Sequence, residues 1–243
     1  YEIINPTKAQ VLKNEILANY PDSRYAQIIL NPKEALMDNQ NPETVFKNIY
    51  TQLDKGEIRE AYTEVNERVD MYFGDEILPK MELLRAMVLA RTNGLDTYKK
   101  ALNDISLTYQ NTLEGKQAQE LLNKDIPALE SMTFSNEDKF SWKILFPKKL
   151  ESGKTYEDLT KKLSKYIKDS HNDDLKLSTD FYTLENDFVV IHGFKSKETA
   201  EAVLIYLREN KEYKVKDEAY IISSDNYRVV QVKKQFQEWL KIE

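Results

Sequence analysis

Hydrophobic residues in the first half of the chain recur at the three-to-four-residue spacing of one helical face. Polar residues fill the positions between them, so each predicted helix has one apolar stripe that a neighbouring helix must cover. Pro42 and Pro79 fall in the first turn of their helices, where proline is tolerated. The predicted helices after the N-terminal region cover 42–55, 57–73, 75–92, 95–109 and 113–122.

The turns between some of these helices share a pattern, which indicates helical repeats. A helix ends on an aromatic residue, a short polar turn follows, and Ser, Asp or Thr is placed to cap the next helix. Ala26 and Gly115 each lie three residues after such a cap, where paired helices could approach closely. The loop 31–41 is rich in Asn and Pro and lengthens the stretch of chain between the first and the second of these turns. The turns with this pattern are Tyr20–Ser23, Tyr72–Asp75 and Tyr109–Thr112.

The hydrophobic spacing changes after residue 135, where strand patterns alternate with helix patterns. The predicted order β-α-β-β-α-β is that of a split βαβ, ferredoxin-like unit. We therefore expect an α plus α/β chain, with helical repeats over 1–135 and a small ferredoxin-like domain over 136–243. The predicted strands are 140–146, 175–184, 187–194 and 219–223; the predicted helices are 154–169, 196–210 and a closing, whole or broken, 225–242.

Composition excludes several classes of function. The formal net charge of the chain is −6, and all of it comes from residues 1–135. Residues 136–243 hold equal numbers of acidic and basic residues. Neither part has the basic character of a nucleic-acid binder. The chain lacks cysteine, which excludes disulfides and thiolate chemistry, and it has no apolar run long enough to span a membrane. It begins at Tyr1 without a signal peptide, so we expect a processed chain or part of a longer one, with any membrane anchor lying upstream.

The candidate chemistry is sparse, and we expect neither an enzyme nor a bound cofactor or metal. The segment around His171 reads as a polar loop after a helix and lacks the ligand spacing of a calcium loop. A serine–histidine–carboxylate triad could be built around His192, but no nucleophile elbow accompanies it. No glycine-rich loop follows a predicted strand, so nucleotide-binding motifs are absent from the sequence.

Two surfaces are candidates for binding. The first is the concave face of the helical stack, because helical repeats commonly grip peptides or helices there. The alternative is that its polar residues are ordinary solvated positions. The candidate residues on this surface are Asn48, Gln52, Arg85 and Arg91.

The second candidate is the sheet face that the predicted helices leave open. Strand alternation places His192 on the same face as Phe188, Val190 and Phe194, while Val189 and Ile191 point to the opposite face. The resemblance to SPOR domains described below implies that the face of Val189 and Ile191 packs against the helices. The alternative is that the closing helix folds over this face through Tyr227, Phe236 and Trp239. The candidate residues on the open face are Trp142, Tyr182, Phe188 and His192.

Three stretches resemble known envelope proteins. Tyr20–Ala26 resembles the YPxSxYA helix junction of tetratricopeptide lipoproteins of Gram-negative envelopes. Phe188–Phe194, followed by Ser196–Ala202, resembles the strand–helix unit of sporulation-related-repeat (SPOR) domains. The ending from Ala219 to Leu240 is similar to that of the SprE/PorW family of Bacteroidota, whose members join tetratricopeptide-like repeats to a small α/β domain.

The resemblance implies a non-enzymatic scaffold of gliding motility and type IX protein secretion. Such a protein would lie in the periplasm, associated with the outer membrane, and its partners would be other secretion and gliding envelope proteins. The chain lacks the lipobox cysteine and the longer upstream repeats of that family, so a membrane anchor would lie outside it. The alternative function is peptidoglycan binding, with glycan strands held on the SPOR-like sheet.

Overall fold

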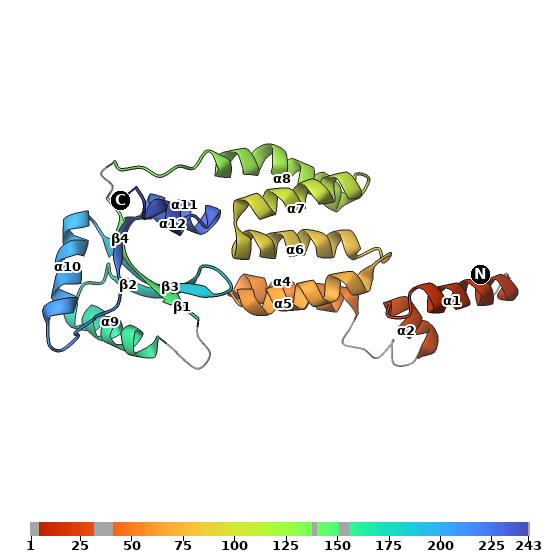
Figure 1. Ribbon diagram of the computed structural model, residues 1–243, viewed down its shortest axis with the longest axis horizontal. Coiled ribbons are helices and arrows are strands. Elements are labelled where there is room, and N and C mark those ends of the chain that lie inside the picture. Colours follow the sequence, from red (N-terminus) through yellow and green to blue (C-terminus); the bar gives the residue numbers. More distant parts are fainter. Residues whose placement is uncertain (1–4, 32–40, 138–139, 151–155, 243) are drawn as a thin grey trace. The chain divides into compact units, whose positions relative to one another are not determined.

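The computed structural model describes residues 5–31, 41–137, 140–150 and 156–242 (Figure 1). The chain is mixed α and β, is mostly helical, and contains one four-stranded antiparallel sheet. It divides into two compact units. Unit 1 is 1–89 with 100–122, and unit 2 is 90–99 with 123–243. Most of the predicted loop 31–41 lies outside the described residues.

Unit 1 is built from helices, and those from α4 onward follow one another through short turns (Figure 1). Its helices correspond to those that the hydrophobic spacing predicts, except that the last one continues to Glu130 past Pro127. The helices are α1 (Pro6–Asn19), α2 (Arg24–Leu30), α4 (Pro42–Lys55), α5 (Ile58–Val69), the 3-10 turn η1 (Asp70–Tyr72), α6 (Leu78–Asn93), α7 (Leu95–Thr108) and α8 (Leu113–Glu130), the last three of which extend into unit 2.

The hairpin of α4 and α5 shows how local sequence sets these boundaries. The Asn41 side chain accepts a hydrogen bond from the Glu43 N–H, which caps the start of α4. Gly56 ends α4 with φ of 81°, a left-handed conformation that suits glycine. The apolar stripes of both helices, including Val45 and Val65, are buried in one core with α6. Burial of these stripes drives the pairing of the helices.

The predicted repeat turns share a hydrogen bond. In each, the backbone N–H of the capping residue donates to the carbonyl of the aromatic residue three positions earlier, at 2.9–3.1 Å. Gly115 is required after the last turn, because a Cβ there would lie 1.9 Å from the Tyr109 carbonyl oxygen. The three bonds join Ser23 to Tyr20, Asp75 to Tyr72, and Thr112 to Tyr109.

The sheet of unit 2 has the strand order β2-β3-β1-β4, and every pair is antiparallel. Strand β1 continues through Pro147, where the sequence predicts its end. Proline is tolerated there because β4 pairs with β1 only as far as Leu145, which leaves that side of β1 unpaired. The elements are β1 (Trp142–Lys149), α9 (Glu157–Ser170), β2 (Lys176–Phe181), β3 (Asn186–Phe194), α10 (Lys197–Glu209) and β4 (Tyr220–Ser223).

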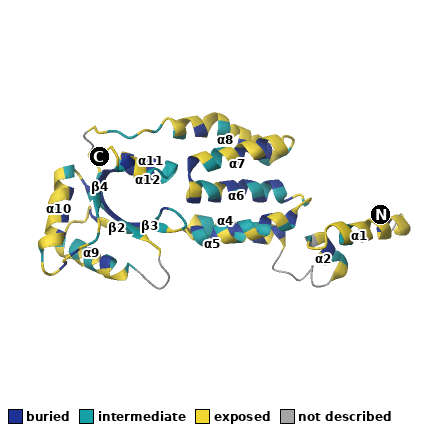
Figure 2. Cartoon of the chain, in the orientation of Figure 1, coloured by how far each residue is buried: buried dark blue, intermediate teal, exposed yellow. Residues whose placement is uncertain are grey.

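One face of the sheet, which we call face A, packs against α9 and α10. Ile144 and Ile191 are fully buried there against Leu163 of α9 and Leu207 of α10. Strands β3 and β4 are mostly buried, while α9 and α10 carry many exposed residues (Figure 2). The spacing of Tyr206 fits the inward stripe of α10, yet its side chain is 49% exposed.

The opposite face, face B, lies under two short helices that follow β4 directly: α11 (Ser224–Lys233) and α12 (Phe236–Trp239). The closing helix is therefore broken, and Lys234 at the break has a left-handed φ of 58°. Phe188 of β3 lies 5.2 Å from Phe236, measured between ring centroids. Of the two alternatives for this face, the structure shows the covered one.

Gly193 changes which face the end of β3 presents. Its φ is 101°, and the pairing of β1 with β3 shifts register there. This is a β-bulge, in which one extra residue interrupts the alternation of side chains. Phe194 consequently packs on face A with Trp142, and not on face B beside His192 as strict alternation predicts.

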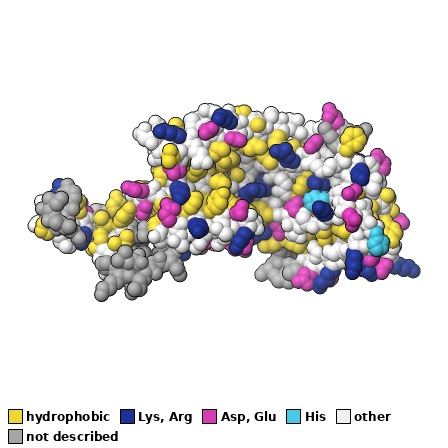
Figure 3. Space-filling view, turned by 180° about the vertical axis from the view of Figure 1, so that it is seen from behind, with side chains coloured by type: hydrophobic (Ala, Val, Ile, Leu, Met, Phe, Trp, Pro, Cys, Tyr) yellow, Lys and Arg dark blue, Asp and Glu magenta, His cyan; other side chains and the backbone are white. Residues whose placement is uncertain are grey.

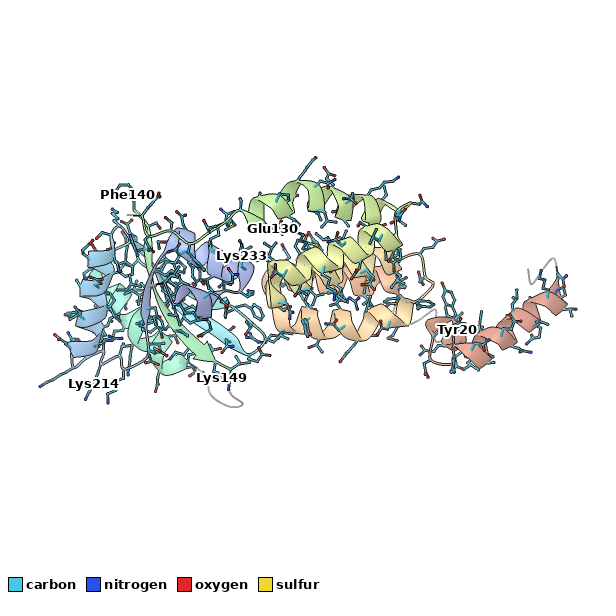
Figure 4. The ribbon with its side chains drawn as sticks, turned by 45° about the horizontal axis from the view of Figure 1, so that its top comes forward. Tyr20, Glu130, Phe140, Lys149, Lys214 and Lys233 are labelled. Carbon is cyan, nitrogen blue, oxygen red and sulfur yellow. The ribbon has the colours of Figure 1, made fainter. Side chains whose placement is uncertain are left out.

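The connection into the sheet is fixed to α11 within unit 2. The Asn226 side chain donates to the Ser135 carbonyl and accepts from the Ser135 N–H, both at 2.9 Å. The Lys233 ammonium donates to the carbonyls of Glu130, at 2.7 Å, and Met132, at 2.6 Å, which caps the end of α8 (Figure 4). Helix α11 thus covers face B and also binds the segment that leads into β1.

Candidate functional site

The predicted open sheet face does not exist as one surface. Trp142 lies on face A, while Tyr182 and Phe188 are 8% and 1% exposed under α12 on face B. The prediction that these residues form a binding face is therefore wrong. The reason is that the C-terminal helices supply aromatic side chains that bury Tyr182 and Phe188 in the core. Of the four predicted residues, His192 keeps a polar, partly exposed environment.

His192 lies in a polar cluster at one end of face B. Its Nε2 is 2.6 Å from the Ser178 hydroxyl of β2, and its Nδ1 is 3.0 Å from the Lys143 ammonium of β1. The Tyr227 hydroxyl of α11 donates to the Asp180 carboxylate at 2.5 Å beside them. Figure 3 shows one face of the molecule, on which histidine, basic and acidic side chains lie among apolar ones.

The electrostatics of this cluster favour a neutral histidine. Burial lowers the pKa of His192, and the neighbouring Lys143 charge lowers it further, while Asp180 acts in the opposite direction. Burial also lowers the pKa of Lys143, again opposed by Asp180. Burial and the Asp180 carboxylate raise the pKa of Tyr227, so the phenol stays protonated and donates its hydrogen bond.

The hydrogen bonds of His192 do not fit a general base for Ser178. An ammonium group is a donor only, so Lys143 donates to Nδ1, and the imidazole proton then lies on Nε2. In that tautomer Nε2 donates to the serine hydroxyl and cannot accept its proton. A catalytic triad would require a carboxylate at Nδ1, where this cluster has a cation.

The residues predicted on the helical repeats occupy different environments. Asn48 and Arg91 are exposed, and Arg91 falls in the stretch 90–99 that belongs to unit 2. Gln52 donates to Glu64 at 2.9 Å, and its buried Oε1 has no partner among the described residues. Arg85 forms an ion pair with Glu82 at 2.7 Å. The structure therefore gives Gln52 and Arg85 partners within unit 1.

Sequence reasoning missed an apolar surface on unit 1. Phe73, Leu107 and Leu113 are 69%, 69% and 80% exposed. They lie beside the α5–α6 and α7–α8 turns, and successive helices run in opposite directions, so both turns are at the same end of these helices (Figure 1). We call these three residues the apolar end of unit 1. A signal was present, since Leu107 and Leu113 flank the otherwise polar turn after Tyr109.

A second missed surface is a hollow of about 430 Å³ between α9 and α10 of unit 2. Tyr166, Tyr206 and Tyr213 line it together with Asp169. The centroids of the three tyrosine rings lie 5.6–5.9 Å apart. The hollow was not predicted, because Tyr166 and Tyr206 fit the inward stripes of their helices. We call this surface the tyrosine hollow.

Within the described parts of the chain, no group of three or more histidine, cysteine or acidic side chains is placed to hold a metal ion. None of the described helices combines the length and the apolar character needed to cross a membrane.

Comparison with known proteins gives no assignment, because no protein-family model and no curated protein matches this sequence.

Proposed function

We propose that this chain is a non-enzymatic scaffold in the periplasm, associated with the outer membrane, and part of the type IX secretion and gliding machinery. In this proposal unit 1 is a tetratricopeptide-like repeat array, and the sheet of unit 2 is a ferredoxin-like, SPOR-like domain. The machinery is proposed from the SprE/PorW-like ending and the YPxSxYA-like junction. The shared hydrogen bond of the repeat turns and the strand order β2-β3-β1-β4 are consistent with the two architectures.

The apolar end of unit 1 carries the interaction part of the proposal. Large apolar side chains that are exposed at one end of a helical unit are candidates for burial by a partner. Phe73, Leu107 and Leu113 are all more than two-thirds exposed. A partner protein that covers these side chains would remove their apolar surface from water, which favours binding.

A pull-down from native envelopes after mild crosslinking tests this proposal. The wild-type chain should recover other secretion and gliding proteins, identified by mass spectrometry. The double variant Leu107→Ser with Leu113→Ser should reduce their recovery about tenfold, because central apolar contacts dominate interface energies. The matched control is Ile205→Ser, which changes a 55% exposed residue of α10 in unit 2 and should leave recovery unchanged.

Two outcomes would count against the proposal. Recovery of envelope proteins unrelated to secretion or gliding would remove the assigned machinery. Equal recovery by the wild type and the double variant, with thermal melting unchanged, would show that the apolar end is not the contact surface.

Peptidoglycan binding through the sheet has less support. That function needs an open aromatic face, and the burial of Tyr182 and Phe188 under α12 counts against it. We expect the chain not to sediment with purified sacculi. Saturable sedimentation would restore this alternative and would require α11 and α12 to leave face B.

A further inference from the structure

The tyrosine hollow has hydrogen-bonding groups that the protein itself leaves unused. The Tyr206 hydroxyl accepts a hydrogen bond from the Asn210 amide at 2.8 Å, which leaves the phenolic proton free to donate. The Tyr166 hydroxyl makes no hydrogen bond within the described part of the chain. The hollow therefore offers two phenolic donors, one from each helix.

An acidic acceptor lies beside these donors. The Asp169 carboxylate accepts a hydrogen bond from the Tyr213 hydroxyl at 2.8 Å. This bond, together with burial and the charge of Asp169, raises the pKa of Tyr213 to about 12. Only one Asp169 oxygen takes part, so the second can accept from a ligand. Asp169 is exposed, and no lysine or arginine lines the hollow.

The geometry excludes two classes of ligand. A caged ammonium ion needs space between aromatic faces. Here the ring centroids lie only 5.6–5.9 Å apart, so the tyrosines contact one another. An anion would meet the Asp169 carboxylate, and the basic side chain beside the hollow, Lys165, is already paired with Glu212.

A polyproline II peptide matches the remaining features. Its backbone makes no internal hydrogen bonds, so its carbonyl groups are acceptors for phenolic donors. Its proline rings pack on aromatic side chains, which is how proline-rich segments dock in aromatic-lined grooves. Ala202 and Val203 of α10 add an apolar lining between the tyrosines. The free Asp169 oxygen favours a peptide with a neighbouring arginine.

We propose that the tyrosine hollow between α9 and α10 binds a proline-rich segment of a partner protein that carries an arginine beside its prolines. Tyr166 and Tyr206 donate to the peptide carbonyls, and Asp169 pairs with the arginine. This site lies on α9 and α10 of unit 2 and is separate from the apolar end of unit 1. Failure at either surface therefore leaves the other proposal standing.

Titration calorimetry with the whole chain and a synthetic peptide of repeated Pro-Pro-Leu units ending in arginine tests the site. Tyr206→Ala should weaken binding about tenfold, because it removes both a packing surface and a donor. Tyr166→Phe should weaken it about threefold, since only the hydroxyl is lost. Tyr50→Ala is the control, because Tyr50 is 48% exposed on α4 in unit 1 and should have no effect.

A second peptide separates the charge contribution from the proline contribution. Replacing the arginine by glutamine should weaken binding to the wild type but make little difference to binding by Asp169→Asn. Absence of peptide binding by the wild type, with melting temperature intact, overturns the proposal. Binding of a chitooligosaccharide in place of the peptide, lost in Tyr206→Ala, also overturns it and assigns the hollow to a saccharide.

Discussion

The two faces of the sheet are covered in different ways. Face A lies under α9 and α10, two separate helices inserted between strands, and its core is mostly aliphatic. Face B lies under α11 and α12, which follow β4 and end the described chain, and its core is rich in aromatic rings. Helix α12 spans only Phe236–Trp239. A short helix can close a sheet face if its few residues are large, because each aromatic side chain buries a large apolar area.

The surfaces associated with the two sides also differ in chemistry. The helix layer of face A carries the tyrosine hollow, where phenols and one carboxylate are available to a ligand. The uncovered end of face B carries His192, whose ring nitrogens are both taken by neighbours. The polar groups on the face A side are thus open to a partner, while those of face B mainly satisfy one another.

The largest expected effect tests the dependence of face B on aromatic residues. Phe236→Ala should lower the free energy of unfolding by about 3–5 kcal/mol, the usual cost of truncating a buried phenylalanine. Phe236 contacts the rings of Tyr182, Phe188 and Trp239. Urea denaturation followed by circular dichroism measures the change.

The matched change on face A is Leu163→Ala, at a fully buried position of α9. It should cost about 2–5 kcal/mol. If Phe236→Ala instead costs less than about 1 kcal/mol, α12 contributes little to the core, and the contrast between the faces fails.

The next effect concerns the residue at which β3 changes faces. Gly193→Ala should destabilise unit 2 by about 2–3 kcal/mol, because strained backbone and steric overlap both oppose it. A Cβ at Gly193 would lie 2.0 Å from the Asp174 carbonyl oxygen. Gly74→Ala provides the control, since its φ of +80° is similar but no atom lies within 4 Å of the added Cβ. Equal losses for the two variants would mean that overlap with Asp174 is unimportant.

The smallest expected effect is the pH dependence that His192 adds to face B. The charged and titratable groups around it are Lys143, Lys176 across the β2–β3 pair, Asp180 and Tyr227. Its pKa is lowered in the folded state from about 6.5 in the unfolded chain. The unfolded state therefore binds the proton more readily, so His192 stabilises the fold above pH 6.5 and that contribution is lost as the pH falls through the folded pKa.

Unfolding measured between pH 7.5 and 5.5 tests this sign. The wild type should lose more stability over the range than His192→Gln does. His171→Asn is the control, because His171 is exposed at the end of α9 in a left-handed conformation that asparagine also adopts. If the wild type instead gains stability relative to His192→Gln as the pH falls, the direction of the His192 pKa shift is wrong.

Most boundaries of the helices and strands could be predicted from local sequence. Asn41 with Pro42 starts α4, and Gly56 ends it, because capping and left-handed backbone are decided by neighbouring residues. The length of α8 could not be predicted from local sequence, because the helix continues through Pro127, a residue that usually breaks helices. The passage of β1 through Pro147 likewise depends on the partner strand β4 ending at Leu145.

The candidate sites were harder to predict. His192 was identified as a polar residue in an apolar strand, and the structure places it in a hydrogen-bonded cluster. Its predicted companions were wrong for two reasons. Gly193 moved the end of β3 to the other face, and α12 buried Phe188. Tyr206 fits the apolar stripe of its helix in the sequence, but the structure exposes it at the tyrosine hollow.

The sequence by itself determined the starts of the helices from α4 onward, the order of strands and helices after residue 135, and the absence of thiol chemistry. These properties follow from spacing, capping and composition, which act between residues close in the chain. Only the tertiary structure decided that face B is covered, that Tyr166 and Tyr206 form one hollow, and that Lys143 faces His192. These features join residues from different elements, and the hydrophobic pattern alone fits more than one way of packing them.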